Sequence, residues 1–179
     1  MRTILLLAFS ALALVATPAA AKLSPAESKM ALTVDAEQER TLQMLEKWVN
    51  QNSGSLNIPG VTKVGEMLRA ELEPMGFKVR WIDMRETGRA GHIIATHKGN
   101  GRGKRMLLIG HLDTVFELDS PFQRWERNGN EAVGPGSGDD KGGMAVMIAA
   151  LRAMHSAGTL KKADIEVCLL YTSPSPRDS

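Results

Sequence analysis

Cysteine is nearly absent from this sequence of 179 residues, which has a single cysteine at position 168. One thiol cannot form a disulfide within the chain, so the sequence excludes a disulfide framework. An excess of charge of one sign is absent too. The formal net charge is +2, which is too small to indicate a nucleic-acid partner. No internal repeat is visible, so a repeat architecture is not expected.

A hydrophobic run long enough to cross a membrane is also missing. The apolar stretch from Ile4 to Val15 has about a dozen residues, whereas a bilayer crossing needs roughly 20. Arg2 precedes this stretch and Ala19-Ala20-Ala21 follows it, an arrangement typical of an export signal with an A-x-A cleavage site. We therefore predict that residues 1–21 are a signal peptide, without stable membrane insertion, and that the mature protein is periplasmic or secreted. A retained membrane anchor is the alternative.

The C-terminal segment 168–179 is rich in serine and proline. Its two prolines, Pro174 and Pro176, are expected to stop any strand or helix. The segment also resembles the translation of a sequencing-adapter sequence read through an open frame, so we interpret it as a non-native tail. A native disordered tail is the alternative. Residues 22–167 then remain, which is enough chain for one domain.

The apolar pattern of residues 22–167 predicts helices that alternate with strands. Apolar residues at helical spacing indicate helices over residues 35–51, 61–73 and 141–157. Alternating or continuous apolar residues indicate strands over residues 77–81, 92–97, 106–109 and 164–167. The third strand is apolar on both faces, as expected deep in a helix-covered sheet. The whole pattern predicts an α/β fold with a mixed β-sheet.

A histidine and an aspartate follow the strand predicted at 106–109. Gly110 separates the strand from His111, and Asp113 lies two positions further on. Side chains two positions apart on an extended backbone leave the same face. Asp113 can therefore accept from one ring N–H of His111 while the other ring nitrogen binds a metal. Taken alone, such a His-x-Asp pair is more often structural than a metal ligand.

A second motif delivers two adjacent carboxylates to the start of a helix. The glycine-rich segment 134–138 favours a flexible loop, and Asp139 and Asp140 follow it immediately before the helix predicted at 141–157. The N-terminal end of a helix dipole favours negative charge, and an N-cap aspartate explains one of the two carboxylates without any metal. Two carboxylates together indicate a divalent cation as their counter-charge.

Together these motifs resemble the co-catalytic zinc exopeptidases that include glutamate carboxypeptidase, aminoacylase and succinyl-diaminopimelate desuccinylase. The resemblance covers residues 51–167 and is closest to the glutamate carboxypeptidase group. Residues Asp139 to Gly142 match the Asp-x-Lys-Gly signature, which a related aminopeptidase group with His-x-Asp and Asp-Asp lacks. The group resemblance rests on Asn52-Ser53-Gly54-Ser55, on Gly110 to Phe116, and on the segment from Pro121-Phe122 to Arg127.

The resemblance implies roles for three residues. His111 would be a ligand of one zinc ion, Asp139 would bridge two zinc ions, and Asp113 would be the catalytic-site residue that orients His111. It further implies that the Asp139–Asp140 peptide is cis. Two zinc ions would polarise the scissile carbonyl and activate a water molecule.

The resemblance also implies that parts of the enzyme are missing from this sequence. The general-base glutamate, further metal ligands and a lid or dimerisation domain would follow the strand predicted at 164–167. The chain would then be an N-terminal fragment of the catalytic domain, and a homodimer would need the missing domain. His111 and Asp139 alone cannot complete a four-coordinate zinc site. We therefore predict that this chain is inactive by itself.

The implied activity is zinc-dependent hydrolysis of an amide bond next to a free carboxylate. The substrate would be a small peptide or an N-acyl amino acid, and release of a C-terminal residue such as glutamate is the leading hypothesis. An N-acyl-amino-acid deacylase or a dipeptidase of the same superfamily is one alternative. A non-catalytic descendant that binds peptides or metal is another.

Three further histidines and one lysine are the other polar residues of interest. His92, His97 and His155 are expected to be structural. Lys141 has two interpretations, because it could pair with a carboxylate of the site or cap the loop that precedes it.

Overall fold

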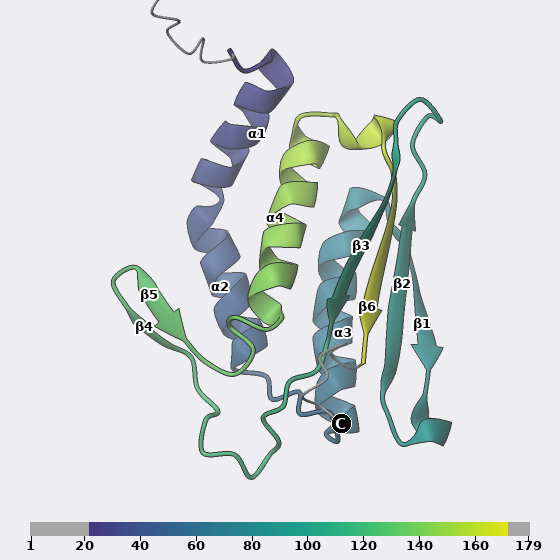
Figure 1. The fold of residues 1–179 in the computed structure, drawn as a ribbon. Helices are drawn as coiled ribbons and strands as arrows, with labels where there is room; N and C mark the ends of the chain where they lie inside the picture. The colour runs from purple at the N-terminus through teal and green to yellow at the C-terminus, as the bar shows by residue number, and fades with distance from the viewer. Residues whose placement is uncertain (1–21, 172–179) are drawn as a thin grey trace, which may run out of the picture.

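The computed structural model describes residues 22–171 (Figure 1). The predicted signal peptide, residues 1–21, and the final part of the predicted tail, residues 172–179, lie outside the described residues. Among the helices of residues 22–171, none is long and apolar enough to cross a membrane.

The main sheet has four strands in the order β1-β2-β6-β3. β2 pairs antiparallel with β1 and with β6, whereas β3 runs parallel to β6. A parallel pair needs a crossover connection, and α4 lies in the connection between β3 and β6. The mixed sheet with helices confirms the predicted α/β fold. The strands are β1 (Lys78–Asp83), β2 (Gly91–His97), β3 (Arg105–His111) and β6 (Asp164–Leu170).

Four α-helices cover one face of this sheet. In Figure 1, α3 and α4 lie against the strands, and α1 and α2 lie on the other side of α4. A separate hairpin of β4 and β5 lies away from the sheet. The helices are α1 (Pro25–Ala36), α2 (Gln38–Val49), α3 (Ile58–Leu72) and α4 (Lys141–Ser156), and the hairpin strands are β4 (Glu126–Asn128) and β5 (Glu131–Val133). Short 3₁₀ turns occupy Glu73–Met75, Arg85–Thr87 and Leu160–Lys162.

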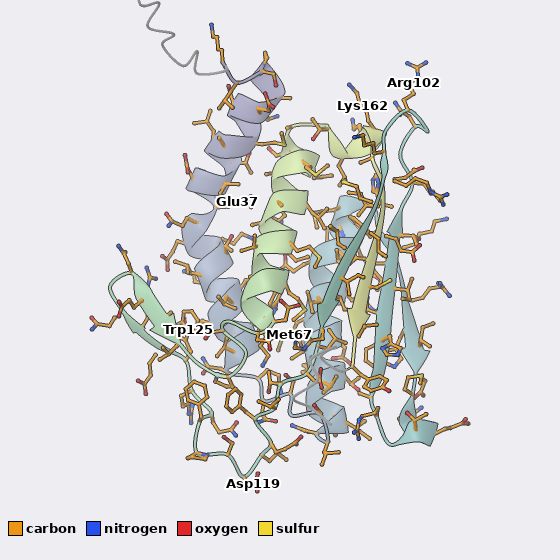
Figure 2. All side chains as sticks on the ribbon, viewed as in Figure 1. Glu37, Met67, Arg102, Asp119, Trp125 and Lys162 are labelled. Atoms are coloured by element: carbon orange, nitrogen blue, oxygen red, sulfur yellow. The ribbon has the colours of Figure 1, made fainter. Side chains whose placement is uncertain are left out.

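The hydrophobic core lies between the sheet and the helices. Side chains from both layers fill this space in Figure 2, and Glu37, at the junction of α1 and α2, forms an ion pair with Arg152 of α4 at 2.6 Å. Every residue of the apolar stripe predicted for α4 is buried: Met144, Ile148 and Leu151. Burial of large apolar side chains stabilises the fold, and cutting one such leucine back to alanine typically costs about 2–5 kcal/mol.

Most of α1 is not predicted from the sequence, because the helix expected at residues 35–51 includes only its last two residues. None of the residues of α1 is buried, so no apolar stripe marks this helix in the sequence. Its start carries a capping box, in which the Ser24 hydroxyl accepts from the Glu27 N–H and the Glu27 carboxylate accepts from the Ser24 N–H. That Ser-x-x-Glu pattern is the sequence signal that indicates the helix.

The expectation that β3 lies deep in the sheet is wrong. β3 is the last strand in the order of the described sheet. Leu107 and Ile109, which point to the face without helices, are 57% and 60% exposed. A strand that is apolar on both faces indicates only that both faces favour burial, and the described helices cover just one of them.

β6 is longer than the strand predicted at 164–167. It continues through Cys168 and Leu169 to Leu170, and the Leu169 side chain is fully buried in the core. The boundary placed at residue 167 therefore cuts the strand three residues short, because the prolines that end the apolar pattern come only at Pro174 and Pro176. The origin of segment 168–179 stays a prediction.

Candidate metal centre

His111 is the last residue of β3, not a residue beyond the end of the strand as predicted. Its backbone pairs with Leu170 of β6, and the next residue, Leu112, donates its N–H to the Leu170 carbonyl at 2.8 Å. The residue is only 6% exposed. The parallel ladder therefore fixes the position from which the imidazole projects, at the C-terminal edge of the sheet.

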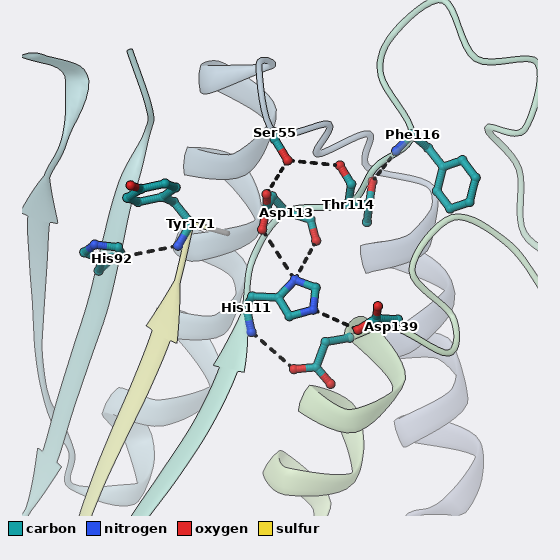
Figure 3. Close-up of polar contacts among 9 residues, drawn as sticks. Ser55, His92, His111, Asp113, Thr114, Phe116, Asp139 and Tyr171 are labelled. Atoms are coloured by element: carbon teal, nitrogen blue, oxygen red, sulfur yellow. Dashed lines mark hydrogen bonds and ion pairs between the residues drawn. The ribbon is translucent and has the colours of Figure 1, made fainter. Parts of the chain in front are cut away.

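One ring nitrogen of His111 faces Asp113, as the two-residue spacing predicts. Nδ1 lies 3.0 Å from the Asp113 carbonyl oxygen and 3.4 Å from the carboxylate oxygen Oδ1. Ser55, from the loop after α2, donates its hydroxyl to the other carboxylate oxygen of Asp113 (Figure 3). Oδ1 is buried and has no hydrogen-bond partner among residues 22–171. The buried Asp113 carboxylate is thus aimed at Nδ1.

The other ring nitrogen of His111 faces Asp139. Nε2 lies 2.9 Å from the Asp139 carboxylate oxygen Oδ1, although the two residues are 28 positions apart in the sequence (Figure 3). The Asp139 side chain is 80% exposed and the His111 side chain 7%. The Asp139–Asp140 peptide is cis, as the resemblance implies. The structure therefore brings together all three site residues predicted from the sequence: His111, Asp113 and Asp139.

The two carboxylates control the protonation of His111. Burial by itself lowers the pKa of the imidazole, but hydrogen bonds and charge interactions with Asp113 and Asp139 outweigh it and raise the pKa to about 9. At neutral pH the imidazole is therefore protonated, and it donates from Nε2 to the Asp139 carboxylate and from Nδ1 to the Asp113 carbonyl. The proton on Nε2 occupies the place where a shared cation would sit.

A pocket opens beside these residues. It has a volume of about 190 Å³ and is lined by Ser55, His111, Asp113, Thr114, Val115, Phe116 and Asp139. A larger hollow of about 490 Å³ lies between α3 and β1, but none of the three predicted site residues lines it. The smaller pocket is the candidate site, because its lining includes all three predicted site residues beside an apolar wall of Val115 and Phe116.

The donor groups fit a zinc ion. An imidazole nitrogen and a carboxylate oxygen are ligands that zinc accepts, and a carboxylate on the other imidazole nitrogen is the usual support of a metal-binding histidine. The buried, unpartnered Oδ1 of Asp113 is placed for that support. Within residues 22–171 no group of three or more histidine, cysteine, aspartate or glutamate side chains could hold a metal. Ligands beyond His111 and Asp139 are therefore needed to complete a site.

Two neighbouring side chains contribute to the site in ways that the sequence analysis missed. Asp140 accepts the backbone N–H of His111 at 3.2 Å, and burial raises the pKa of its carboxyl group. Ser55 holds the Asp113 carboxylate from a loop that is 58 positions away in the sequence. Long-range contacts of this kind leave no local pattern, so no sequence signal identifies them.

Lys141 does not pair with a carboxylate of the described residues. The interpretation that it pairs with a carboxylate of the site is therefore wrong. Its side chain is fully buried, and Nζ donates to the Gln51 carbonyl at 2.8 Å. Burial lowers its pKa to about 8. The ammonium group thus ties the first turn of α4 to the loop that follows α2.

The other histidines have structural contacts. His92 stacks on Tyr171 with ring centroids 4.7 Å apart and accepts the Tyr171 N–H at 3.1 Å. His97 Nδ1 lies 3.0 Å from the Ala163 carbonyl. His155 is exposed near the end of α4. None of the three lines the candidate pocket.

Comparison with known proteins shows which family and which proteins this chain is similar to. Residues 107–171 match the model of Peptidase family M20/M25/M40. The chain is 36% identical over 126 residues to carboxypeptidase G2 of Pseudomonas sp. (strain RS-16), an alignment that covers 68% of this chain and 29% of that protein. It is 34% identical over 109 residues to succinyl-diaminopimelate desuccinylase of Novosphingobium aromaticivorans, covering 57% of this chain and 29% of that protein.

Solved structures share the fold. Human carnosine dipeptidase 1 matches with a TM-score of 0.67 at 18% identity, covering 86% of this chain and 36% of that one. A di-peptidase from Saccharomyces cerevisiae matches with a TM-score of 0.64 at 16% identity, covering 80% and 34% of the two chains. The chain thus spans less than a third of the length of the curated relatives and about a third of these structures.

Proposed function

From the premise that this chain belongs to the zinc exopeptidase superfamily, we propose that the whole protein is a zinc-dependent hydrolase that cleaves an amide bond next to a free carboxylate. The comparisons support a peptidase or amidohydrolase of family M20/M25/M40. The observation that carries the finer proposal is the approach of His111 Nε2 to the Asp139 carboxylate at 2.9 Å, beside a pocket.

His111 and Asp139 would hold the metal, with Asp139 bridging to a second zinc ion. Zinc bound there would polarise the substrate carbonyl and lower the pKa of a water molecule. His111 must release the proton on Nε2 before this nitrogen can bind a cation. Asp113 then keeps the remaining proton on Nδ1, because its buried carboxylate and its carbonyl both face that nitrogen. The Asp113 carboxylate thereby fixes the tautomer that leaves the Nε2 lone pair free.

A carboxypeptidase that releases a C-terminal residue such as glutamate is the leading form of the proposal. It is supported by the identity to carboxypeptidase G2, which extends over 126 residues. An N-acyl-amino-acid deacylase or a dipeptidase is the second candidate, supported by the likeness to the desuccinylase and by the folds of the two dipeptidases. A non-catalytic protein that binds peptides or metal is the third, and it requires that the general base be absent.

The general-base glutamate and the remaining zinc ligands are proposed to lie outside residues 22–171. The 179-residue chain is then expected to be inactive by itself, because His111 and Asp139 leave a four-coordinate site incomplete. A homodimer would need a further domain. We further propose, from the export signal predicted over residues 1–21, that the mature protein is periplasmic or secreted.

An activity assay of the protein encoded by the whole gene tests the proposal. Zinc-loaded protein is offered an N-acyl-glutamate, a dipeptide and an N-succinyl amino acid, and the released amine is measured. We expect zinc-dependent hydrolysis that falls by at least about a thousandfold in H111A and D139A, because loss of a metal ligand removes the water-activating centre. H155A, which alters an exposed histidine outside the pocket, is the control. Equal activity in wild type, H111A and D139A would refute the assignment.

A further inference from the structure

Asp140 occupies the N-cap position of α4, yet its side chain does not cap the helix. No hydrogen bond joins its carboxylate to the first turn of α4. Oδ2 instead accepts the backbone N–H of His111 at 3.2 Å. The interpretation of one aspartate as an ordinary N-cap is therefore wrong for Asp140. Its carboxylate reaches across to the end of β3 and contacts the residue that carries the imidazole.

Two glycines leave room for this carboxylate. A Cβ atom added at Gly110 would lie 2.5 Å from Asp140 Oδ2, and one added at Gly143 would overlap Oδ1. The nearest atom in both cases belongs to the tip of the Asp140 side chain, not to backbone. The Asp140 carboxylate thus lies between the glycine before His111 and a glycine in the first turn of α4.

Hydrogen bonds of α4 and of Lys141 also hold the backbone around Asp140. The Asp140 carbonyl accepts the Met144 N–H at 2.8 Å, within the helical hydrogen-bond pattern. Lys141, the next residue, is tied to the Gln51 carbonyl. Asp139 itself is largely exposed, and within residues 22–171 its one side-chain partner is His111. Its direction therefore depends on the residues that hold the peptide after it.

We propose that Asp140 is a positioning residue of the metal centre: its carboxylate, held between Gly110 and Gly143, ties the His111 backbone to the start of α4 and so sets the separation of His111 from Asp139. The inference rests on the proposed zinc site. It goes beyond that site because it assigns a role to Asp140, which contacts the backbone of the metal-binding residue His111 and does not contact the ion. Partners that orient a metal ligand typically change metal affinity about 10- to 100-fold when they are removed.

Four variants of the protein encoded by the whole gene test this role, with the zinc ion alone as the probe. D140A removes the acceptor, whereas D140N keeps a side-chain oxygen at the same place. G110A and G143A displace the carboxylate from opposite sides. We expect zinc affinity, measured by competition with a chromophoric chelator, to fall about 10- to 100-fold in D140A, G110A and G143A. D140N should stay within about threefold of wild type. D119A, at an exposed carboxylate that does not line the candidate pocket (Figure 2), is the matched control and should not change the affinity.

G143A separates positioning from stability. Gly143 is an exposed position of α4, and alanine stabilises a helix relative to glycine. The unfolding temperature of G143A should therefore be equal to or above that of wild type, while its zinc affinity falls. If D140A and G143A both bind zinc as tightly as wild type, the positioning role is refuted.

The backbone amide of His111 gives a readout that does not depend on zinc. An amide proton that donates to a carboxylate resonates downfield, so the His111 amide signal should move upfield in D140A and stay in place in D140N. An unchanged His111 amide signal in D140A would refute the hydrogen bond from the His111 N–H to the Asp140 carboxylate. If the wild-type chain shows no zinc-dependent shift of the His111 ring nitrogens, the proposed zinc site fails instead, and the amide signal still reports the tie.

Discussion

Replacing His111 with glutamine should remove a pH dependence of folding stability that the metal-free protein shows between pH 6.5 and about 9. The folded-state pKa of His111 is raised from 6.5 to about 9 by Asp113 and Asp139, against the opposing effect of burial. In this interval the folded protein binds a proton on His111 that the unfolded chain has released. The stabilisation is therefore complete below pH 6.5 and is lost as the pH rises to about 9.

The size of the stability change follows from the pKa shift of His111 and from the solvent exposure of Asp113 and Asp139. A shift of about 2.5 pKa units corresponds to about 3.4 kcal/mol at roughly 1.36 kcal/mol per unit. Asp139 is 80% exposed, so solvent screens part of its interaction with His111. Asp113 is buried and its interaction is screened less. We therefore expect a loss of about 2–3 kcal/mol across the interval.

Urea unfolding in the presence of EDTA measures the effect. The free energy of unfolding is determined for wild type and H111Q at several pH values from about 6 to about 9. The advantage of wild type over H111Q should shrink by about 2–3 kcal/mol as the pH rises. Other titrating groups are common to both proteins and cancel in the difference. A difference that stays constant, or that grows with pH, would refute the arrangement of His111 between two carboxylates.

Three further outcomes follow from the structure. Between pH 8 and 10.5 the buried Lys141, whose folded pKa is lowered from 10.5 to about 8, binds fewer protons than it does in the unfolded chain. Wild-type stability should therefore rise over this interval, and K141M should lack the rise in urea unfolding. Zinc displaces the proton of His111, so the apparent zinc affinity should increase about tenfold per pH unit up to about pH 9 in calorimetric titrations. The double variant L107K/I109K should reduce self-association of this chain in sedimentation velocity, because both side chains are exposed on the outermost strand of the described sheet, whereas V146K on α4 should not.

The fold was largely predictable where apolar periodicity reflects burial. The apolar stripe of α4 and the alternation over residues 77–81 are sequence patterns that match the observed elements, because one face of each element packs against the core. α1 could not be predicted from apolar periodicity, because none of its residues is buried. The position of β3 at the end of the described sheet was not predictable either. An apolar strand favours burial of both faces, but its sequence does not say which strands or helices lie beside it.

The candidate site was predictable only in part. His111, Asp113 and Asp139 stand in two recognisable motifs, and the structure brings them together across 28 positions of sequence. The contacts that hold these three residues in place do not belong to any sequence motif. Ser55 reaches Asp113 and Lys141 reaches the loop after α2 through contacts between segments that are far apart in the chain. Such contacts depend on the packing of whole elements, which a single sequence does not encode as a local pattern.

Crystals of the protein grown with zinc test the central claim most directly, through anomalous diffraction measured at the zinc absorption edge. The account predicts an anomalous peak within about 2.0–2.2 Å of both His111 Nε2 and a carboxylate oxygen of Asp139. In that structure Asp113 should still face His111 Nδ1. A zinc ion bound elsewhere, with His111 Nε2 still hydrogen-bonded to Asp139, would contradict it.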